Sequence, residues 1–496
     1  ISDDYGFSKL SFAWTVRKSG SENQQAELKT REISFDRSLM QQQFFYFMDM
    51  STLLIEPGDE VEYYFEVADN DGVTGSKSTR SDLYTFKVPT LEEIEKMTEK
   101  KSEDIKDKME SVIKQSKTLQ HKVEDMQRKM VDKNEIGWQE KQALKQLLDK
   151  QNELQQQVKE IQNENKEKNL KENQYTELSP DLLEKQKQLE ELFNKVMTED
   201  LKKMYDELQK MLDEVNKDKV AEMLDKMKDD TRSLEKEIDR NLELFKQLEL
   251  EQKMQQVIDK TLKLAENQEK LSEETNNASR KDIESLSKKQ DELNRQFDEL
   301  KRDIDDLHKK NEELEEPNSL GKTDTEEKEI EQEMDNSSQE LNQGKSSKAA
   351  QSQKNASGKM KQLSQKLSQM QQEMQNEEQG EDIEAIRQIL DNLVKISFDQ
   401  EAIMNQANLV STTNPKYLQM IQAQKNLKED LKLVADSLYA LSKRQAAIEP
   451  FVLREMTAVE NNMDEAVVQM NNRALALARA KQQYAMTSVN NLALML

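Results

Sequence analysis

The chain has 496 residues, of which 35% are charged and 34% hydrophobic, so it holds too little apolar surface for several compact domains. Its formal net charge of -25 argues against a nucleic-acid backbone or an anionic lipid surface as the main partner, since both need a basic patch. Cysteine is absent, which excludes disulfides and thiolate sites. No run approaches about eighteen consecutive apolar residues, so no membrane-spanning helix is predicted within this sequence.

Residues 1–89 alternate apolar and polar side chains with a period of two, which predicts β-strands. The apolar faces are Leu10, Phe12, Trp14 and Val16; Val61, Tyr63, Phe65 and Val67; and Tyr84, Phe86 and Val88. Turn sequences separate these strands at Ser19-Gly20-Ser21, Pro57-Gly58-Asp59 and Asp69-Asn70-Asp71-Gly72. The region therefore predicts an Ig-like β-sandwich without the cysteine pair of antibody domains, in which Ile1-Ser2-Asp3-Asp4 is the tail of a first strand.

Four aspartates of this region, Asp3, Asp4, Asp69 and Asp71, fall near predicted loops. Carboxylates clustered near loops are the hard oxygen ligands that calcium takes. Their spacing is not that of an EF-hand, and Asp-Asn-Asp-Gly is first of all a turn sequence. The turn is favoured, and calcium binding stays open.

Residues 91–316 carry apolar side chains three and four positions apart, which predicts a segmented coiled coil. The clearest runs are Ile105, Met109, Val112, Ser116, Leu119, Val123, Met126 and Met130; Leu144, Leu147, Gln151, Leu154, Val158 and Ile161; and Leu182, Gln186, Leu189, Phe193 and Val196. Pro89 ends the last strand and Thr90 is a candidate N-cap. Breaks are predicted at Gly137, Ser179-Pro180, Thr198 and Asn216-Lys217-Asp218. One continuous helix would measure roughly 340 Å, so we expect the helices to fold back on one another.

Residues 317–380 are rich in Ser, Asn, Gln, Lys and Glu, and this composition predicts a flexible polar linker with a short polar helix near 360–374. A break is expected at Gln379-Gly380-Glu381. Residues 381–496 predict a bundle of three helices, divided at Asn414-Pro415 and Glu449-Pro450. Its expected core comprises Ile386, Ile389, Leu390, Leu393 and Val394; Leu431, Val434, Leu438 and Leu441; and Leu453, Met456, Met463, Val467 and Met470, whereas Gln422 is expected to face water.

Several stretches resemble catalytic motifs without their full pattern. Gly321-Lys322-Thr323 and Gly344-Lys345-Ser346 match the end of a P-loop, but Glu316 and Gln339 stand where the earlier glycine is required. His121 and His308 lie far apart within helical repeats, which favours surface positions over a catalytic base or zinc ligand. Acid pairs such as Asp229-Asp230 and Glu312-Glu313 indicate solvated helix faces. No catalytic, cofactor-binding or metal-binding residue is assigned, and no enzymatic activity is predicted.

Methionine is frequent, with 24 residues in all. Its seam positions, which favour adaptable core packing over a ligand-gripping surface, are Met109, Met126, Met130, Met204, Met211, Met223 and Met227. No acidic residue follows Glu465, and a stripe rich in small residues is expected there at Val467, Met470, Ala474, Leu477, Tyr484 and Ser488. Close helix packing is favoured for this stripe; a docking face for a partner or membrane surface is the alternative.

Two segments of the N-terminal region, Asp3-Asp4-Tyr5-Gly6-Phe7-Ser8-Lys9-Leu10 and residues 57–71 (PGDEVEYYFEVADND), resemble the Ig-like module of an uncharacterised family of large envelope proteins from Bacteroidota. The resemblance extends to residues 237–244 (EIDRNLEL), 441–445 (LSKRQ) and 485–496. In that family, N-terminal membrane helices precede the Ig-like module and a long periplasmic coiled coil. The resemblance implies a periplasmic location and inner-membrane anchoring through a segment missing from this chain, which begins at Ile1 and is expected to be a processed or excised piece.

These features together predict a non-enzymatic scaffold of the bacterial cell envelope. Its expected partners are envelope proteins, with no nucleic acid, small-molecule substrate or cofactor. The alternative is a periplasmic holdase-type chaperone, whose splayed helices grip unfolded clients on Met- and Leu-rich surfaces. The sequence leaves open the partner, the oligomeric state, and whether the coiled coil is intramolecular or intermolecular.

Overall fold

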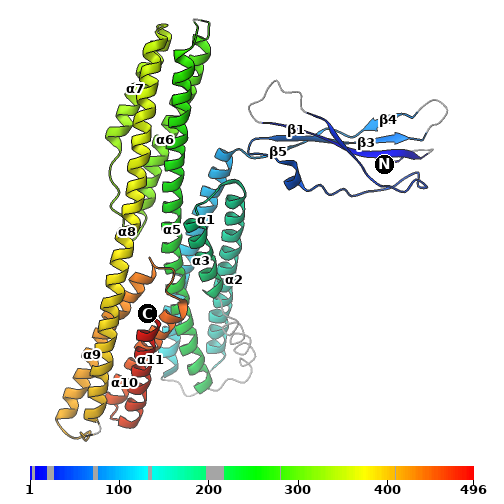
Figure 1. Ribbon diagram of the computed structural model, residues 1–496. Coiled ribbons are helices and arrows are strands. Elements are labelled where there is room, and N and C mark those ends of the chain that lie inside the picture. The colour runs from blue at the N-terminus through cyan, green and yellow to red at the C-terminus, as the bar shows by residue number, and fades with distance from the viewer. Residues whose placement is uncertain are drawn as a thin grey trace. The chain divides into compact units, whose positions relative to one another are not determined.

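The structure is a computed structural model that describes residues 1–2, 6–18, 27–70, 76–131, 137–196, 217–279, 281–407 and 409–496. This part of the chain is mainly helical, with a small antiparallel sheet near the N-terminus (Figure 1). The chain divides into two compact units, residues 1–105 with 164–177, and residues 106–163 with 178–496. Helices α1 (Leu91–Val131) and α2 (Trp138–Tyr175) contribute residues to both units.

The sheet of the first unit is antiparallel and has the strand order β2-β1-β3-β4, with β5 also paired to β3. Its strands are β1 (Phe7–Arg17), β2 (Lys29–Glu32), β3 (Glu60–Asp69), β4 (Ser78–Arg80) and β5 (Tyr84–Lys87), and a 3-10 helix, η1, spans Met50–Leu53. The long pair runs from Phe7 opposite Asp69 to Arg17 opposite Glu60. Gly58, with a φ of 88°, makes the predicted turn before β3. The left-handed conformation is one that glycine adopts readily.

The sheet core confirms the predicted apolar faces of the two long strands. Leu10, Phe12 and Trp14 of β1 cluster with residues of β3 that were predicted to share a face, namely Tyr63, Phe65 and Val67. On β5, by contrast, Tyr84 and Phe86 are exposed. The described strands form one sheet, and over one of its faces lies the extended segment 42–49 rather than a second sheet. The structure thus shows a small antiparallel sheet where a β-sandwich was predicted.

Helix α1 begins as predicted at a capping box. The Thr90 hydroxyl accepts a hydrogen bond from the Glu93 amide at 3.2 Å, and the Glu93 carboxylate accepts one from the Thr90 amide at 2.9 Å. Further along the first unit, Lys101 of α1 pairs with Glu167 of α2 at 2.9 Å. The same two helices meet in the second unit through Lys108 and Glu160 at 2.8 Å, which shows that they are antiparallel.

The spacing of three and four correctly predicted which helix faces are buried. Every residue of the three clearest runs in 105–196 is buried. The breaks at Gly137 and Ser179-Pro180 are confirmed, because α2 begins at Trp138 and α3 (Pro180–Val196) at Pro180. The structure describes α5 over Lys217–Asn276, and Thr198 and Asn216 lie outside the described residues, so the breaks predicted there stay predictions.

Two four-helix cores follow, and they share one helix. The first core is formed by α5, α6 (Ile283–Glu312), α7 (Asp324–Asn342) and the first half of α8 (Ser346–Ala407). The second core is formed by the second half of α8 with α9 (Lys416–Ser442), α10 (Pro450–Asn471) and α11 (Leu475–Met495). Because α8 is continuous, one backbone runs through both cores.

The interpretation of residues 317–380 as a flexible linker is wrong. Helix α7 and the first half of α8 occupy most of that range, and Gly380 lies inside α8 rather than at a break. The buried residues of the first core in this range are Ile330, Met334, Leu341, Ala349, Ala356, Met360, Leu363, Leu367 and Met374. Small and polar residues complete the buried stripe. The segment therefore has a buried helical face, although its overall composition is polar. Ser357, for example, is buried and donates to the Ala265 carbonyl at 2.8 Å.

The second core confirms the breaks before Lys416 and at Pro450 but has one more helix than predicted. A turn at 472–474, where Arg473 has a φ of 57°, separates α10 from α11. All the core residues expected on α9 and α10 are buried except Val467, which is half-buried, and Gln422 is exposed as expected. On α8, Ile389 and Leu393 are buried, whereas Val394 is 47% exposed.

The stripe expected near the C-terminus is also wrong, because the 472–474 turn interrupts it. Leu477 and Tyr484 are 60% and 61% exposed. The buried face of α11 instead carries Ala478, Gln482, Ala485, Val489 and Leu492. Small residues do pack closely on α11, but on a different face from the one predicted.

Candidate functional site

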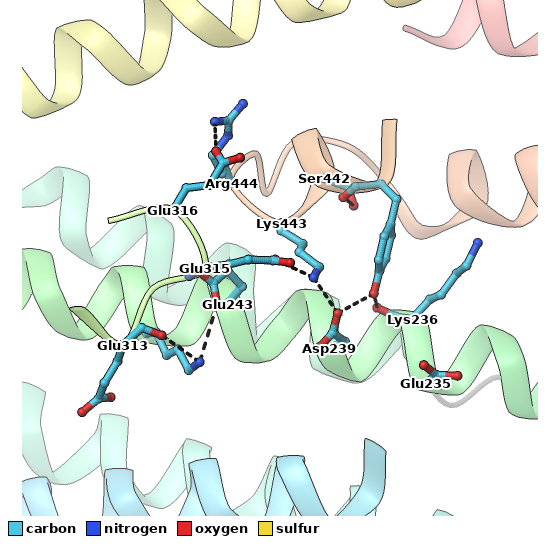
Figure 2. A network of polar contacts seen from close by, with 12 residues as sticks. Glu235, Lys236, Asp239, Glu243, Glu313, Glu315, Glu316, Ser442, Lys443 and Arg444 are labelled. Carbon is cyan, nitrogen blue, oxygen red and sulfur yellow. Dashed lines mark hydrogen bonds and ion pairs between the residues drawn. The ribbon is translucent and has the colours of Figure 1, made fainter. Parts of the chain in front are cut away.

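A network of charged and polar side chains joins α5, the α6–α7 connector and the end of α9 (Figure 2). We call it the α5–α9 junction, defined by Asp239, Arg240 and Glu243 on α5, Glu313–Glu316 on the connector, and Tyr439, Lys443 and Arg444 at α9. At its centre, Asp239 Oδ2 accepts a hydrogen bond from the Tyr439 hydroxyl at 2.7 Å and pairs with Lys443 Nζ at 2.7 Å. Lys443 also pairs with Glu315 at 2.6 Å. One carboxylate of α5 thereby holds two side chains that come from about 200 residues later in the sequence.

Arg240 holds the turn between α9 and α10. It is 1% exposed, and its guanidinium donates to the carbonyls of Ser442 at 2.8 Å and of Gln445 and Ala446 at 3.3 Å each, and also to that of Ile448. Carbonyls at a helix C-terminus lack partners within the helix and favour a nearby cation. Burial lowers the pKa of Arg240 to about 10, so the side chain is charged at neutral pH and caps the end of α9.

Glu237 lies one turn before Arg240 on α5 and is 5% exposed. Arg454 of α10 is its ion-pair partner at 3.8 Å. Burial raises the pKa of Glu237 to about 7, with Arg454 and Arg240 opposing the shift. This carboxyl group therefore titrates near neutral pH at the contact between α5 and α10.

The α6–α7 connector is tied to both sides of the junction. The Glu315 amide donates to Glu243 Oε1 at 2.6 Å, and Lys246 Nζ donates to the Glu313 carbonyl at 3.1 Å. On the other side, Arg444 pairs with Glu316 at 2.6 Å and lies 3.7 Å from Asp382 of α8. The connector thus links α5 to the end of α9 within the second unit, and Arg444 in turn reaches α8.

Three clefts of about 390, 300 and 410 Å³ surround the junction, and Arg444 lines all of them. The largest is lined by the cations Lys443 and Arg444 together with five carboxylates, Glu243, Glu315, Glu316, Glu377 and Glu381. Both cations already pair with carboxylates of the connector. The cleft is therefore a poor site for an anionic ligand.

Two side chains at the centre of the junction, Tyr439 and Lys443, keep their protons near neutral pH. Burial and the neighbouring Asp239 raise the pKa of Tyr439, so its hydroxyl remains a hydrogen-bond donor. The pKa of Lys443 is raised overall: burial by itself would lower it, but the hydrogen bonds to Asp239 and Glu315 outweigh that effect. Neither group is poised to lose a proton near neutral pH, which is what a nucleophile or general base requires.

The structure assigns ordinary structural roles to the described sequence candidates. Asp3, Asp4 and Asp71 lie outside the described residues, and the Asp69 carboxylate accepts a hydrogen bond from the Lys77 amide at 2.8 Å. Among the residues that the structure describes, no three His, Asp or Glu side chains gather as metal ligands.

The two histidines and the P-loop-like segments are likewise separate from the junction. His121 is exposed on α1 and His308 is half-buried on α6. Thr323 bonds Glu327 at 2.6 Å where α7 begins, and Gly344, with a φ of 71°, makes the turn into α8. These segments form helix ends.

Sequence analysis assigned no role to the junction, although two of its segments, 237–244 and 441–445, carried the family resemblance. The feature of the sequence that marks the junction is a run of α5 in which polar residues, Glu237, Arg240 and Asn241, are buried together with the apolar residues of the helix. Charged residues on every side of a helix indicate a solvated helix when no partner is known. The partner of this run lies about 200 residues away, so local spacing does not reveal it.

Comparisons with known proteins identify no relative, since no protein-family model, curated protein or solved structure matches the chain. None of the helices in the described ranges has the length and hydropathy needed to cross a bilayer. Function is therefore inferred from the packing of the helices and from the junction.

Proposed function

We propose that this chain is a non-enzymatic scaffold of the bacterial cell envelope that holds protein partners at a fixed spacing. The observation that carries the proposal is α8, a single helix of 62 residues that belongs to both four-helix cores. At 1.5 Å per residue it measures about 93 Å. Packing along both halves opposes bending, so the two cores are expected to keep a constant separation.

The α5–α9 junction supports this proposal because it provides a second connection between the cores. Helix α5 belongs to the first core, and its Asp239 and Arg240 hold the end of α9 and the turn into α10, both in the second core. Arg240 is buried, and a buried charge is strongly destabilising when it loses its partners, so the contact favours one arrangement. A scaffold needs such a fixed arrangement, whereas a protein that opens around clients does not.

The finer architecture is also part of the proposal. We infer that the sheet belongs to an Ig-like β-sandwich and that α1 and α2 pair as an antiparallel coiled coil. The alternation along β1 and β3 supports the first inference, and the Lys108–Glu160 pair supports the second. The resemblance of the junction segments to Bacteroidota envelope proteins supports a periplasmic location and an inner-membrane anchor outside this sequence.

The holdase alternative depended on Met- and Leu-rich surfaces that would grip unfolded clients. The seam methionines within the described residues, Met109, Met126, Met130, Met223 and Met227, are buried, and Met204 and Met211 lie outside the described residues. Burial of these side chains favours core packing over client binding. The scaffold is therefore the better supported of the two functions.

The proposal is tested by photo-crosslinking in envelope fractions of a bacterium that carries the protein. Crosslinkable residues replace exposed Gln362 in the first core and exposed Lys395 in the second core, singly and together. A scaffold should yield a small, discrete set of partners from each site, and both sets together from the doubly labelled chain. A broad mixture of unfolded clients, together with stoichiometric suppression of aggregation of an unrelated protein, would contradict the proposal.

A matched pair of variants at Gly380 tests the role of spacing. Gly380→Pro removes a hydrogen bond within α8 and kinks a helix, whereas Gly380→Ala favours the helix, and a Cβ atom there meets nothing within 4 Å. Joint capture of both partner sets should fall with proline and persist with alanine. Equal joint capture by both variants would show that the spacing set by α8 is irrelevant.

A further inference from the structure

The segment 42–49 of the first unit behaves as a strand of a second layer over the sheet. Phe44 and Tyr46 pack against the sheet, with ring centroids 5.3 Å from Phe65 and 4.8 Å from Phe12, respectively. The residues that follow each of them point outward: Phe45 is 98% and Phe47 89% exposed. A strict alternation of inward and outward side chains is the geometry of a β-strand.

This segment is paired at its beginning and open after that. The Ile1 amino group donates to the Gln42 carbonyl at 3.1 Å, and the Gln42 amide donates to the Ile1 carbonyl at 3.1 Å. Ser2 and Gln41 form the adjacent antiparallel bridge. From residue 43 to residue 48, no backbone–backbone hydrogen bond is made within the described part of the chain. An extended backbone with unpaired groups is a template for another strand.

The paired residues define the register of that further strand. Ile1 and Gln42 exchange both hydrogen bonds, and in an antiparallel ladder such pairs recur at every second residue. The next groups on the same edge therefore belong to Phe44, Tyr46 and Met48. Side chains of directly opposite residues lie on the same face, and Ile1 packs on the sheet cluster as Phe44 and Tyr46 do.

We propose that residues 43–48 accept an added antiparallel β-strand that is covalently continuous with Ile1 and carries apolar side chains at every second position. The direction of the existing pairing selects this occupant. A polypeptide joined to Ile1 continues along the open edge without a turn, and its alternate residues extend the apolar cluster beside Phe44, Tyr46 and Met48. A separate peptide would instead end against the amino group of Ile1. The inference is independent of the scaffold function, because it concerns the first unit alone.

The test extends the full chain by six residues before Ile1, one for each of residues 43–48. Counting back from Ile1, every second added residue is valine and the others are threonine. The matched control replaces the valines with proline, which has no N–H to donate and is not tolerated within a paired strand. Amide hydrogen exchange is measured by NMR, and circular dichroism verifies that each protein is folded.

We expect the valine–threonine extension to slow exchange of the Phe44, Tyr46 and Met48 amides by at least about tenfold relative to the unextended chain. The Phe45 and Phe47 amides point to the other edge and should change little, and the proline extension should leave all five unchanged. Unchanged exchange in the valine–threonine protein would overturn the proposal. Protection that arises from the same peptide added in trans but not from the extension would instead indicate a separate partner strand. Protection of the unextended chain that grows with protein concentration would indicate pairing between two copies.

Discussion

The two four-helix cores on α8 bury the same kind of polar layer in different apolar surroundings. In the first core, Gln268, Gln290 and Gln353 meet Ser337, one residue from each helix, and all four side chains are fully buried. In the second core, Gln400, Gln424 and Gln482 form a similar layer from three helices. A buried amide must have hydrogen-bond partners, and here it meets them in only one alignment of the helices. The layer therefore fixes the register of the helices.

The surroundings of the two layers differ along α8. The first half of the helix buries small residues such as Ala349 and Ala356, whereas the second half buries Ile389, Leu393 and Ile396. Small residues leave room for backbone contacts, and Ser272 of α5 donates to the Ala350 carbonyl at 2.7 Å. A helix face of low hydropathy can therefore be a buried face when its polar groups are paired. A buried core therefore does not require large apolar side chains at every position.

The largest expected effect tests the second core, where packing depends on large side chains. Leu438→Asp removes a fully buried leucine and places an unpaired charge in its site, so we expect the opening free energy of α9 and α10 to fall by about 3–5 kcal/mol. The matched control, Gln422→Asp, lies on the exposed face of α9 and should change it by less than about 0.5 kcal/mol. Native-state hydrogen exchange of the full chain measures both. Equal losses would show that the buried face of α9 is assigned wrongly.

Glu237, which lies beside the junction at the contact between α5 and α10, should make stability depend on pH. An unfolded glutamate has a pKa near 4.5, and burial raises that of Glu237 to about 7. Between these values the folded chain binds more protons than the unfolded chain, so the free energy of unfolding falls as pH rises. The contribution is fully present below pH 4.5 and is lost as the pH rises through about 7. Its upper limit is about 3 kcal/mol.

Urea denaturation at pH 5 and pH 8 checks this dependence. Glu237→Gln should reduce the loss of stability between the two pH values, and Glu429→Gln on the exposed face of α9 should leave it unchanged. Asp230, whose pKa burial also raises to about 7, should retain part of the dependence in both variants. An undiminished dependence in Glu237→Gln would mean that this carboxyl group is ionised in the folded protein.

The amide layers sharpen the comparison between the cores. Gln290 Oε1 accepts from Gln268, Gln353 and Ser337, so Gln290→Leu leaves three buried donors without that acceptor. Gln424 Oε1 accepts from Gln400 and Gln482. We expect Gln290→Leu in the first core and Gln424→Leu in the second core each to lower the local stability by about 1–3 kcal/mol, with the larger loss for Gln290→Leu. Hydrogen exchange of the α6 and α9 amides measures these losses. A gain in stability in either core would show that its amide layer fixes the register of the helices without stabilising them.

The smallest expected effect concerns the glycines of α8. Gly358 and Gly380 lie inside the helix with open space where a Cβ atom would be. Replacing either by alanine should raise the stability of α8 by about 0.5–1 kcal/mol, because alanine loses less backbone entropy on folding. Thermal denaturation checks this prediction. A loss of stability at Gly380 would indicate that the chain is not helical there.

Prediction from the sequence succeeded where local spacing or a single residue type is enough to identify a buried helix face or a helix end. The spacing of Ile105, Met109 and Val112 predicted a buried helix face, and Pro180 and Pro450 marked helix starts that the structure confirms. It failed where burial depends on a distant partner. Gln353 is buried because Gln290 receives its amide hydrogen, and Asp239 belongs to a junction because Lys443 returns to it. Such pairings follow from the path of the chain rather than from local periodicity, so neither the first core nor the junction was predicted.

The central claim, that α8 is one continuous helix through both cores, is tested most directly by a distance measurement across Gly380. Cysteine is absent from the chain, so Gln362→Cys and Lys395→Cys provide unique sites for spin labels, both exposed on α8 and 33 residues apart. We predict one narrow distance distribution centred near about 50 Å, which broadens and shortens when Gly380→Pro is added. A broad or clearly shorter distribution in the chain that retains Gly380 would contradict the account, because it would place a hinge where the structure has a continuous helix.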